Sequence, residues 1–299
     1  MMATDAMTQE MVKPMVREAQ PGRKSVLGAL LVYALLTLGA LVVIFPFLWM
    51  IFGSFKTIAE SNAYPPTLLP EVWQPQNYLA AWQKPPNTLG RYMVNSLVIA
   101  TVGTGVQLLI CLLAAYAFSR LRFPGRAVLA RGVLFVYLIP GSLLLIPMYL
   151  TIVRLGLKDT YPGLIVANMS FSVPFCTWLM MGYLRSLSAE MEEASLIDGC
   201  TRLLSLWYIV IPLSVPGIVT AAIFIFNGVW NEYIFALIIA QDAAHRMISV
   251  GLSNFYRSDY YMMGPMMAGA LIAMTPVVIL YILAQRYVVS GLAAGAVKG

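Results

Sequence analysis

The sequence contains little charge: Asp, Glu, Lys and Arg make up 11% of its 299 residues, against roughly 25% in an ordinary soluble domain. Hydrophobic residues make up 60% of the chain. A soluble core could not bury so much apolar surface, so lipid must surround much of the protein. The composition therefore excludes an ordinary soluble domain and predicts an all-α, polytopic membrane protein.

Residues for metal, nucleophilic and nucleotide chemistry are also scarce. His245 is the only histidine, and Cys111, Cys176 and Cys200 form no CxxC pair. A single histidine offers almost nothing for a His-based metal site or a Ser-His-Asp triad, and the cysteines indicate no disulfide framework. No G-x-x-x-x-G-K-[ST] loop is present to hold ATP phosphates. We expect no catalytic residue, metal or cofactor in this chain, and no enzymatic activity.

Charge is missing altogether from six apolar runs, each long enough to cross ~30 Å of hydrocarbon as a helix. Ion-coupled transporters usually need ionisable groups inside the membrane. Their absence favours a neutral cargo moved with energy supplied from outside this chain. The six runs are 26–53, 92–118, 132–153, 161–184, 206–229 and 265–285.

The distribution of Lys and Arg predicts the orientation. Segments on the side of the N-terminus hold twelve of these residues and the opposite segments hold seven, so both termini are expected in the cytoplasm. The basic residues flank apolar runs and form no stripe with aromatics, which argues against a nucleic-acid partner. The expected organisation is a tail at 1–25, a transmembrane domain at 26–288, a tail at 289–299, and outer loops at 56–91, 154–160 and 240–264.

Two of the runs contain residues that restrict their packing. The second carries Asn95 and Gln107, whose polar side chains are costly to expose to lipid, and Gly103 and Gly105, which allow close helix packing. This helix is therefore expected inside the bundle. The fifth is expected to kink because prolines remove backbone hydrogen bonds there. Its helix-breaking residues are Pro212, Pro216 and Gly217.

An acidic segment lies between the fourth and fifth runs, on the predicted cytoplasmic side. Ser188 can cap a helix whose first turn is acidic, where carboxylates meet the positive end of the helix dipole. Gly199 can end this helix in a left-handed conformation. A helix of about ten residues is too short to be stable alone, so residues 188–199 should pack against the spans or a partner.

The acidic segment also matches a known motif. Glu193-Ala194-Ser195, then Gly199 and Ile209-Val210-Ile211-Pro212, resembles the EAA loop of ABC importer permeases, with Ser195 and Ile211 as mild departures from the family pattern. Other segments resemble the smaller permease subunit of the maltose-type carbohydrate-uptake branch, and the resemblance extends from about residue 26 to the end. These segments are Asn95-Ser96, Ala115–Arg120, Phe123-Pro124-Gly125, Trp230-Asn231-Glu232 and residues 291–299.

The resemblance implies a helix that couples transport to a separate cytoplasmic ATPase. Two ATPase subunits would bind ATP and Mg, and a second permease subunit and an extracytoplasmic sugar-binding protein would complete a transporter in the bacterial inner membrane. This chain would form half of the translocation pathway. The ATPase-coupling residues would be Glu192, Glu193, Ala194, Ser195, Asp198 and Gly199.

Polar and aromatic residues near the spans are candidates for a substrate path, because amides and aromatic faces suit a sugar. The alternative for the same residues is interhelical hydrogen bonding and interfacial anchoring. The alternative function is a self-contained secondary transporter of a small neutral solute, and a membrane enzyme is a further rival. The candidate path residues are Asn95, Gln107, Asn227, Trp230, Asn231 and Glu232.

Overall fold

The computed structural model describes residues 26–83, 88–255 and 262–296, which form helices and loops without a strand. The predicted N-terminal tail, 1–25, lies outside the described residues. The chain divides into two units, Met1–Trp49 and Met50–Gly299. Helix α1 (Val26–Gly53) supplies the described part of the first unit, and it carries no charged residue. Its 28 residues give a length of about 42 Å, enough to cross a bilayer.

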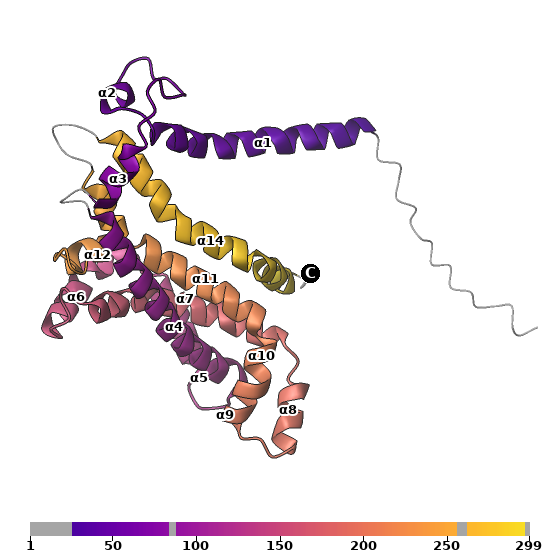
Figure 1. Cartoon of the computed structure of the whole chain (residues 1–299). Helices are drawn as coiled ribbons and strands as arrows, with labels where there is room; N and C mark the ends of the chain where they lie inside the picture. The colour runs from indigo at the N-terminus through magenta and orange to yellow at the C-terminus, as the bar shows by residue number, and fades with distance from the viewer. Residues whose placement is uncertain (1–25, 84–87, 256–261, 297–299) are drawn as a thin grey trace, which may run out of the picture. The chain divides into compact units, whose positions relative to one another are not determined.

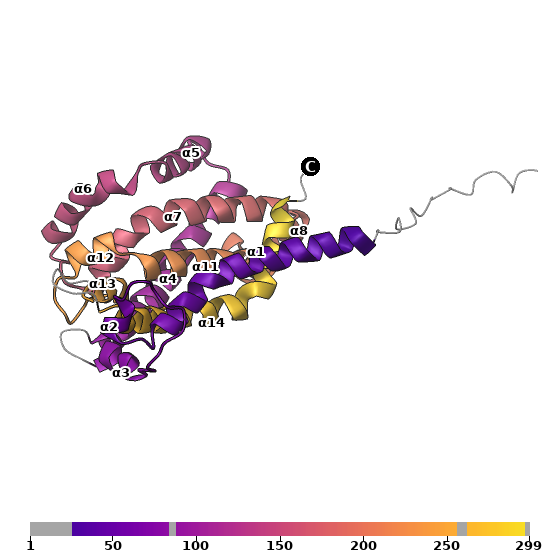
Figure 2. The ribbon, with the colours of Figure 1, turned by 90° about the horizontal axis from the view of Figure 1, so that it is seen from above.

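The second unit is built around three helices that pack side by side: α4 (Leu89–Arg120), α7 (Tyr161–Ser186) and α11 (Val215–Asn231). Figures 1 and 2 show α4 beside α7 and α11, with α14 (Met263–Ala296) along α11. The predicted interior position of the second run is confirmed, because α4 buries Asn95, Ser96 and Gln107 among these helices.

Close packing in this bundle occurs at different glycines from those expected. A Cβ on Gly105 would meet nothing within 4 Å, and one on Gly103 would make an ordinary contact with Ile165. At Gly217 of α11, in contrast, a Cβ would lie 2.6 Å from the ring of Tyr183 on α7. The close approach therefore joins α11 to α7.

The structure agrees with up to six spans, but the third run is bent. Within the described residues, four helices are long and apolar enough to cross a membrane, and two further pairs of helices qualify as bent spans. Residues 132–153 divide into α5 (Arg126–Tyr137) and α6 (Gly141–Arg154), which meet at 100°. The break occurs at Pro140, which has no N–H to continue the helix and disfavours helical geometry in Ile139.

The expected kink in the fifth run is confirmed. The chain bends by 81° where Arg202–Leu213 meets α11. The first arm consists of α9 (Arg202–Ser205), the π-helical turn η1 (Leu206–Val210) and α10 (Ile211–Leu213). Pro212 and Pro216 lie on either side of Ser214, so neither can donate a backbone hydrogen bond across the bend.

The segments predicted to lie outside the membrane are folded. Residues 56–83 contain α2 (Ile58–Ser61) and α3 (Gln76–Gln83), and the Asn77 side chain of α3 donates to the carbonyls of Ser54 and Lys56 in the turn before α2. The predicted loop at 154–160 contacts the start of the predicted loop at 240–264: one Asp159 carboxylate oxygen accepts from the backbone N–H groups of Gln241 and Asp242. Helix α12 (Ile234–Ile239) ends just before the second of these loops, and α13 (Ile248–Ser253) lies within it.

Candidate functional site

The acidic segment forms helix α8 (Glu190–Ile197), slightly shorter than expected. The Ser188 hydroxyl accepts from the Glu190 N–H at 3.2 Å, although the cap position itself falls to Ala189. All three acidic residues of the first turn lie where the helix dipole favours negative charge.

The end of α8 agrees with the sequence prediction. Gly199 adopts a φ of 91°, in the left-handed region that glycine reaches without strain. Its N–H donates to the Leu196 carbonyl at 3.2 Å, and the Cys200 N–H donates to the Ser195 carbonyl at 3.0 Å. This pair of bonds is a Schellman motif, and it satisfies two carbonyls that the helix end would otherwise leave unpaired.

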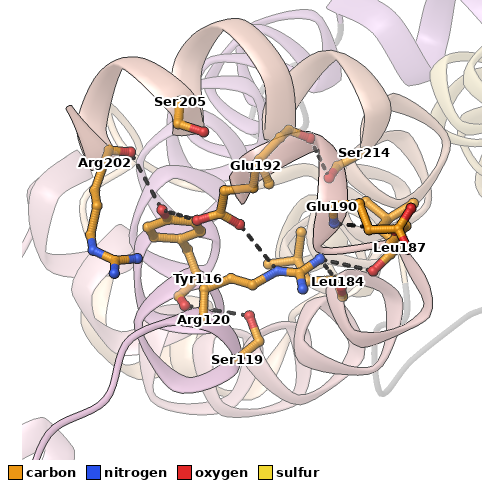
Figure 3. Close-up of polar contacts among 12 residues, drawn as sticks. Tyr116, Ser119, Arg120, Leu184, Leu187, Glu190, Glu192, Arg202, Ser205 and Ser214 are labelled. Carbon is orange, nitrogen blue, oxygen red and sulfur yellow. Dashed lines mark hydrogen bonds and ion pairs between the residues drawn. The ribbon is translucent and has the colours of Figure 1, made fainter. Parts of the chain in front are cut away.

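One face of α8 is anchored to the protein's own helices through Glu192, which is 5% exposed. Tyr116 of α4 donates its hydroxyl to Glu192 Oε1 at 2.6 Å, and Arg120 Nε lies 3.4 Å from Glu192 Oε2 (Figure 3). The short bond is charge-assisted, whereas the longer contact is an ion pair without hydrogen-bond geometry.

Arg120 extends this anchor to a third helix. Its Nη2 donates to the carbonyls of Leu184 and Leu187 at 2.9 Å each, at the end of α7 (Figure 3). A cation at a helix C-terminus is favourable because the last carbonyls are unpaired. On the α9 side, the Ser195 hydroxyl lies 2.7 Å from that of Ser205, which is fully buried. The inner face of α8 is thus joined to α4, α7 and α9.

The opposite face of α8 is exposed. Glu193, Ala194, Asp198 and Gly199 are all exposed, and the apolar side chain of Ile197 is 86% exposed. A face that combines two carboxylates, small residues and a bare apolar side chain suits contact with another protein. The six predicted coupling residues therefore divide into two buried ones, Glu192 and Ser195, and four exposed ones.

Beside α8 lies a cavity of about 660 Å³ between this helix and the segment that follows α4. Glu192 and Glu193 contribute to its lining, but arginines outnumber them, so the cavity is basic. These arginines are Arg120, Arg122, Arg126 and Arg202.

The predicted substrate-path residues do not form one site. Asn95 uses its whole amide within the chain: Nδ2 donates to the carbonyls of Ala244 and Arg246, and Oδ1 accepts from Tyr161, each at 2.9 Å. Gln107 is fully buried, and neither of its amide atoms has a hydrogen-bond partner among the described residues.

Three other path candidates line one cavity of about 460 Å³ between α11 and α14. Asn227 and Asn231 hydrogen-bond to each other at 2.8 Å, and the ring of Trp230 is almost fully buried beside them. Glu232 is not among the lining residues of this cavity. Its two carboxylate oxygens accept from the backbone N–H groups of Phe235 and Ala236, so it caps α12.

Comparison with known proteins identifies the family. Residues 107–293 match the family described as binding-protein-dependent transport system inner membrane component. The chain is 36% identical over 267 residues to the inner membrane ABC transporter permease protein YcjP of Escherichia coli K12, covering 89% of this chain and 95% of that protein. The chain belongs to this family of permeases.

Two further comparisons agree on the relationship and the fold. The permease is 34% identical to the trehalose/maltose transport system permease protein MalG of Thermococcus litoralis, over 93% of this chain and 99% of that one. Its fold also matches, with a TM-score of 0.76 and 24% identity, a crystal structure of a bacterial ABC transporter involved in the import of the acidic polysaccharide alginate, covering 89% and 98% of the two chains. Membership favours the permease interpretation over a self-contained secondary transporter.

Sequence reasoning missed the partners of Glu192 in this permease. Tyr116 and Arg120 fall within the 115–120 segment that resembles the family, but their types and positions alone indicated no role. The available signal was their spacing: residues four apart lie on one helix face, and a polar pair at the end of an apolar helix requires a polar partner.

Proposed function

We propose that the protein is a permease subunit of an ATP-driven sugar importer and that α8 couples it to an ATPase in the cytoplasm. The observation that carries the proposal is the division of α8 into two faces. Glu192 ties one face to the permease, while Glu193 and Asp198 leave the other free for a partner. A short helix anchored in this way transmits rigid-body motion to the spans that it joins.

The partners follow from what this chain lacks. Without a phosphate-binding loop, energy must come from two ATPase subunits that hold ATP and Mg. A second permease subunit supplies the other half of the pathway, and an extracytoplasmic sugar-binding protein docks on the outer segments 56–91 and 240–264. This arrangement requires both termini of the permease to be cytoplasmic, in a bacterial inner membrane.

The cavity between α11 and α14 supports a neutral, sugar-like cargo. Trp230 presents an aromatic ring that suits the apolar C–H face of a sugar, and the amides of Asn227 and Asn231 suit its hydroxyls. The six apolar runs contain no Asp, Glu, Lys, Arg or His for a proton or ion relay. The names of relatives that carry trehalose and maltose agree in substrate class.

The coupling role is tested on the exposed face of α8. Glu193→Ala should lower ATP-dependent uptake by at least about tenfold, because truncating one member of a charge pair in an interface typically costs 2–5 kcal/mol. Glu190→Ala is the matched control, since it removes an exposed carboxylate from the same helix. Uptake into proteoliposomes and ATP hydrolysis are measured together on the purified transporter.

Uptake by each variant is compared at equal expression and equal co-purification with the ATPase subunits. Normal uptake by Glu193→Ala at wild-type levels of the assembled complex would contradict the coupling role. A permease that purifies without any ATP-hydrolysing subunit, yet still transports, would instead favour the secondary transporter.

A further inference from the structure

Side chains attach helix α4 to other segments at both of its ends, and the two attachments lie at opposite ends of the bundle. At its C-terminal end Tyr116 and Arg120 hold α8, and near its N-terminal end Asn95 and Ser96 hold the segment Ala244–Ile248. Both partners are distant from α4 in the sequence, so these contacts form only when the chain folds. In Figure 1 α4 runs between the end of the bundle that carries α8 and α9 and the end that carries α12.

The attachment to α8 is buried and charged. Tyr116 is 5% exposed, and its hydroxyl donates to a carboxylate that is itself 5% exposed. Arg120 pairs with the same carboxylate while it donates to two carbonyls at the end of α7. A displacement of α8 relative to α4 would break these largely buried contacts, so α8 and the end of α4 should move together.

The attachment at the other end is equally buried. Asn95 and Ser96 are 3% and 0% exposed. Asn95 holds the carbonyls of Ala244 and Arg246, and the Ser96 hydroxyl accepts from the Ile248 N–H, with all three distances at 2.9 Å. The segment next to these contacts, residues 241–243, is exposed.

The helix between the two attachments is uninterrupted. Tyr116 and Asn95 are 21 residues apart, which corresponds to about 32 Å along the axis. Prolines interrupt the hydrogen bonding of α7, at Pro174, and of α14, at Pro276, whereas α4 contains none. A helix without a proline kink transmits a displacement along its length instead of absorbing it in a bend.

We propose that α4 is a strut through which α8 and the segment Ala244–Ile248 communicate, and that Tyr116, Arg120, Asn95 and Ser96 are its positioning residues. This inference rests on the proposed function, because it takes α8 as the contact for the ATPase and the outer segment as part of the surface for the binding protein. It adds that the signal travels through the second span, which is distant in sequence from α8. A displacement of α8 must therefore pass through both attachments in turn to reach the segment Ala244–Ile248.

The experiment uses the complete transporter in proteoliposomes and measures how far the sugar-loaded binding protein stimulates ATP hydrolysis. Tyr116→Phe and Ser96→Ala each remove one hydroxyl and leave the packing intact. Each should lower the stimulation about fivefold, the size of effect expected for one hydrogen bond, while hydrolysis without the binding protein stays the same. The loss in the double variant should be clearly smaller than the product of the two single losses, because both changes weaken the same link.

Two controls remove hydroxyls that make no such attachment. The Ser119 hydroxyl donates only to carbonyls within α4, and the Tyr149 hydroxyl on α6 forms no hydrogen bond with another described residue. Ser119→Ala and Tyr149→Phe should leave the stimulation within twofold of the wild type. If the Tyr116→Phe, Ser96→Ala double variant assembles poorly, Glu192→Gln combined with Ser96→Ala repeats the comparison at the same attachment.

Two results would overturn the strut. The first is that neither single variant changes stimulation; the second is that the losses multiply, to about 25-fold, as expected for independent sites this far apart. Either result leaves the proposed function intact if Glu193→Ala still abolishes coupling. A wild-type preparation that neither binds an ATPase nor responds to a binding protein would instead refute the proposed function, and the strut with it.

Discussion

Replacing Glu192 should damage the permease in a different way from replacing its neighbour Glu193. Glu192 is 5% exposed and contacts Tyr116 and Arg120, whereas Glu193 is exposed. We therefore expect Glu192→Ala to destabilise the protein and Glu193→Ala to leave its stability unchanged. The two adjacent carboxylates separate anchoring from coupling.

The magnitude follows from what remains after truncation. Removing one member of a buried ion pair typically costs 3–5 kcal/mol, because the other charge is left unpaired. Arg120 keeps its two carbonyl partners at 2.9 Å, so we expect the lower limit, about 3 kcal/mol. Glu193→Ala at an exposed position should change the free energy of unfolding by less than about 0.5 kcal/mol.

The assay is thermal unfolding of the purified permease in detergent, followed by limited proteolysis after Arg185 and Arg202, the basic residues that flank α8. Glu192→Ala should unfold at a lower temperature and should be cleaved faster at these positions. Glu192→Gln keeps a hydrogen-bond acceptor for Tyr116 and should fall between the wild type and the alanine variant. Equal stability of the Glu192→Ala and Glu193→Ala variants would refute the assignment of faces on α8.

Three further predictions concern the bundle and the cavity. Gly217→Ala should cost about 1–3 kcal/mol of stability, because its Cβ would lie 2.6 Å from the Tyr183 ring; Gly105→Ala, with nothing within 4 Å, should cost nothing in the same thermal unfolding assay. Gln107→Leu should raise stability by about 1 kcal/mol or more, since it removes two buried amide atoms without hydrogen-bond partners; a loss of uptake with unchanged stability would instead support a path role. Asn231→Ala should raise the KM for uptake by about fivefold without changing assembly, because Asn231 is exposed and lines the α11–α14 cavity; an unchanged KM would argue against a sugar path through this cavity.

Sequence patterns predicted the membrane character of this protein and the C-terminal end of its acidic helix, because both depend on local chemistry. Apolar runs without charge must be helices in lipid, since every backbone group has to be hydrogen-bonded within its own segment. Gly199 was expected to adopt a left-handed conformation, and it does. The bend near Pro216 was predictable for the same reason, because a proline acts on its own helix whatever surrounds it.

The length of an apolar run did not predict the break that a proline causes within it. The run 132–153 satisfied the length of a span, but Pro140 divides it into two helices that meet at 100°. The substrate-path residues show a different limit of sequence reasoning: residue type indicates that Asn95 forms hydrogen bonds, but type does not specify the partner. In the structure its amide is fully used by Ala244, Arg246 and Tyr161.

By itself, then, the sequence determined which segments are apolar helices and where the acidic helix stops, since these follow from composition and from the backbone preferences of single residues. Only the tertiary structure decided which carboxylate of α8 turns inward. Glu192 and Glu193 are adjacent and chemically identical, and they differ only because Tyr116 and Arg120, more than seventy residues earlier, meet one of them. A buried charge is stable only beside such partners, and the packing of α4 against α7 brings them there.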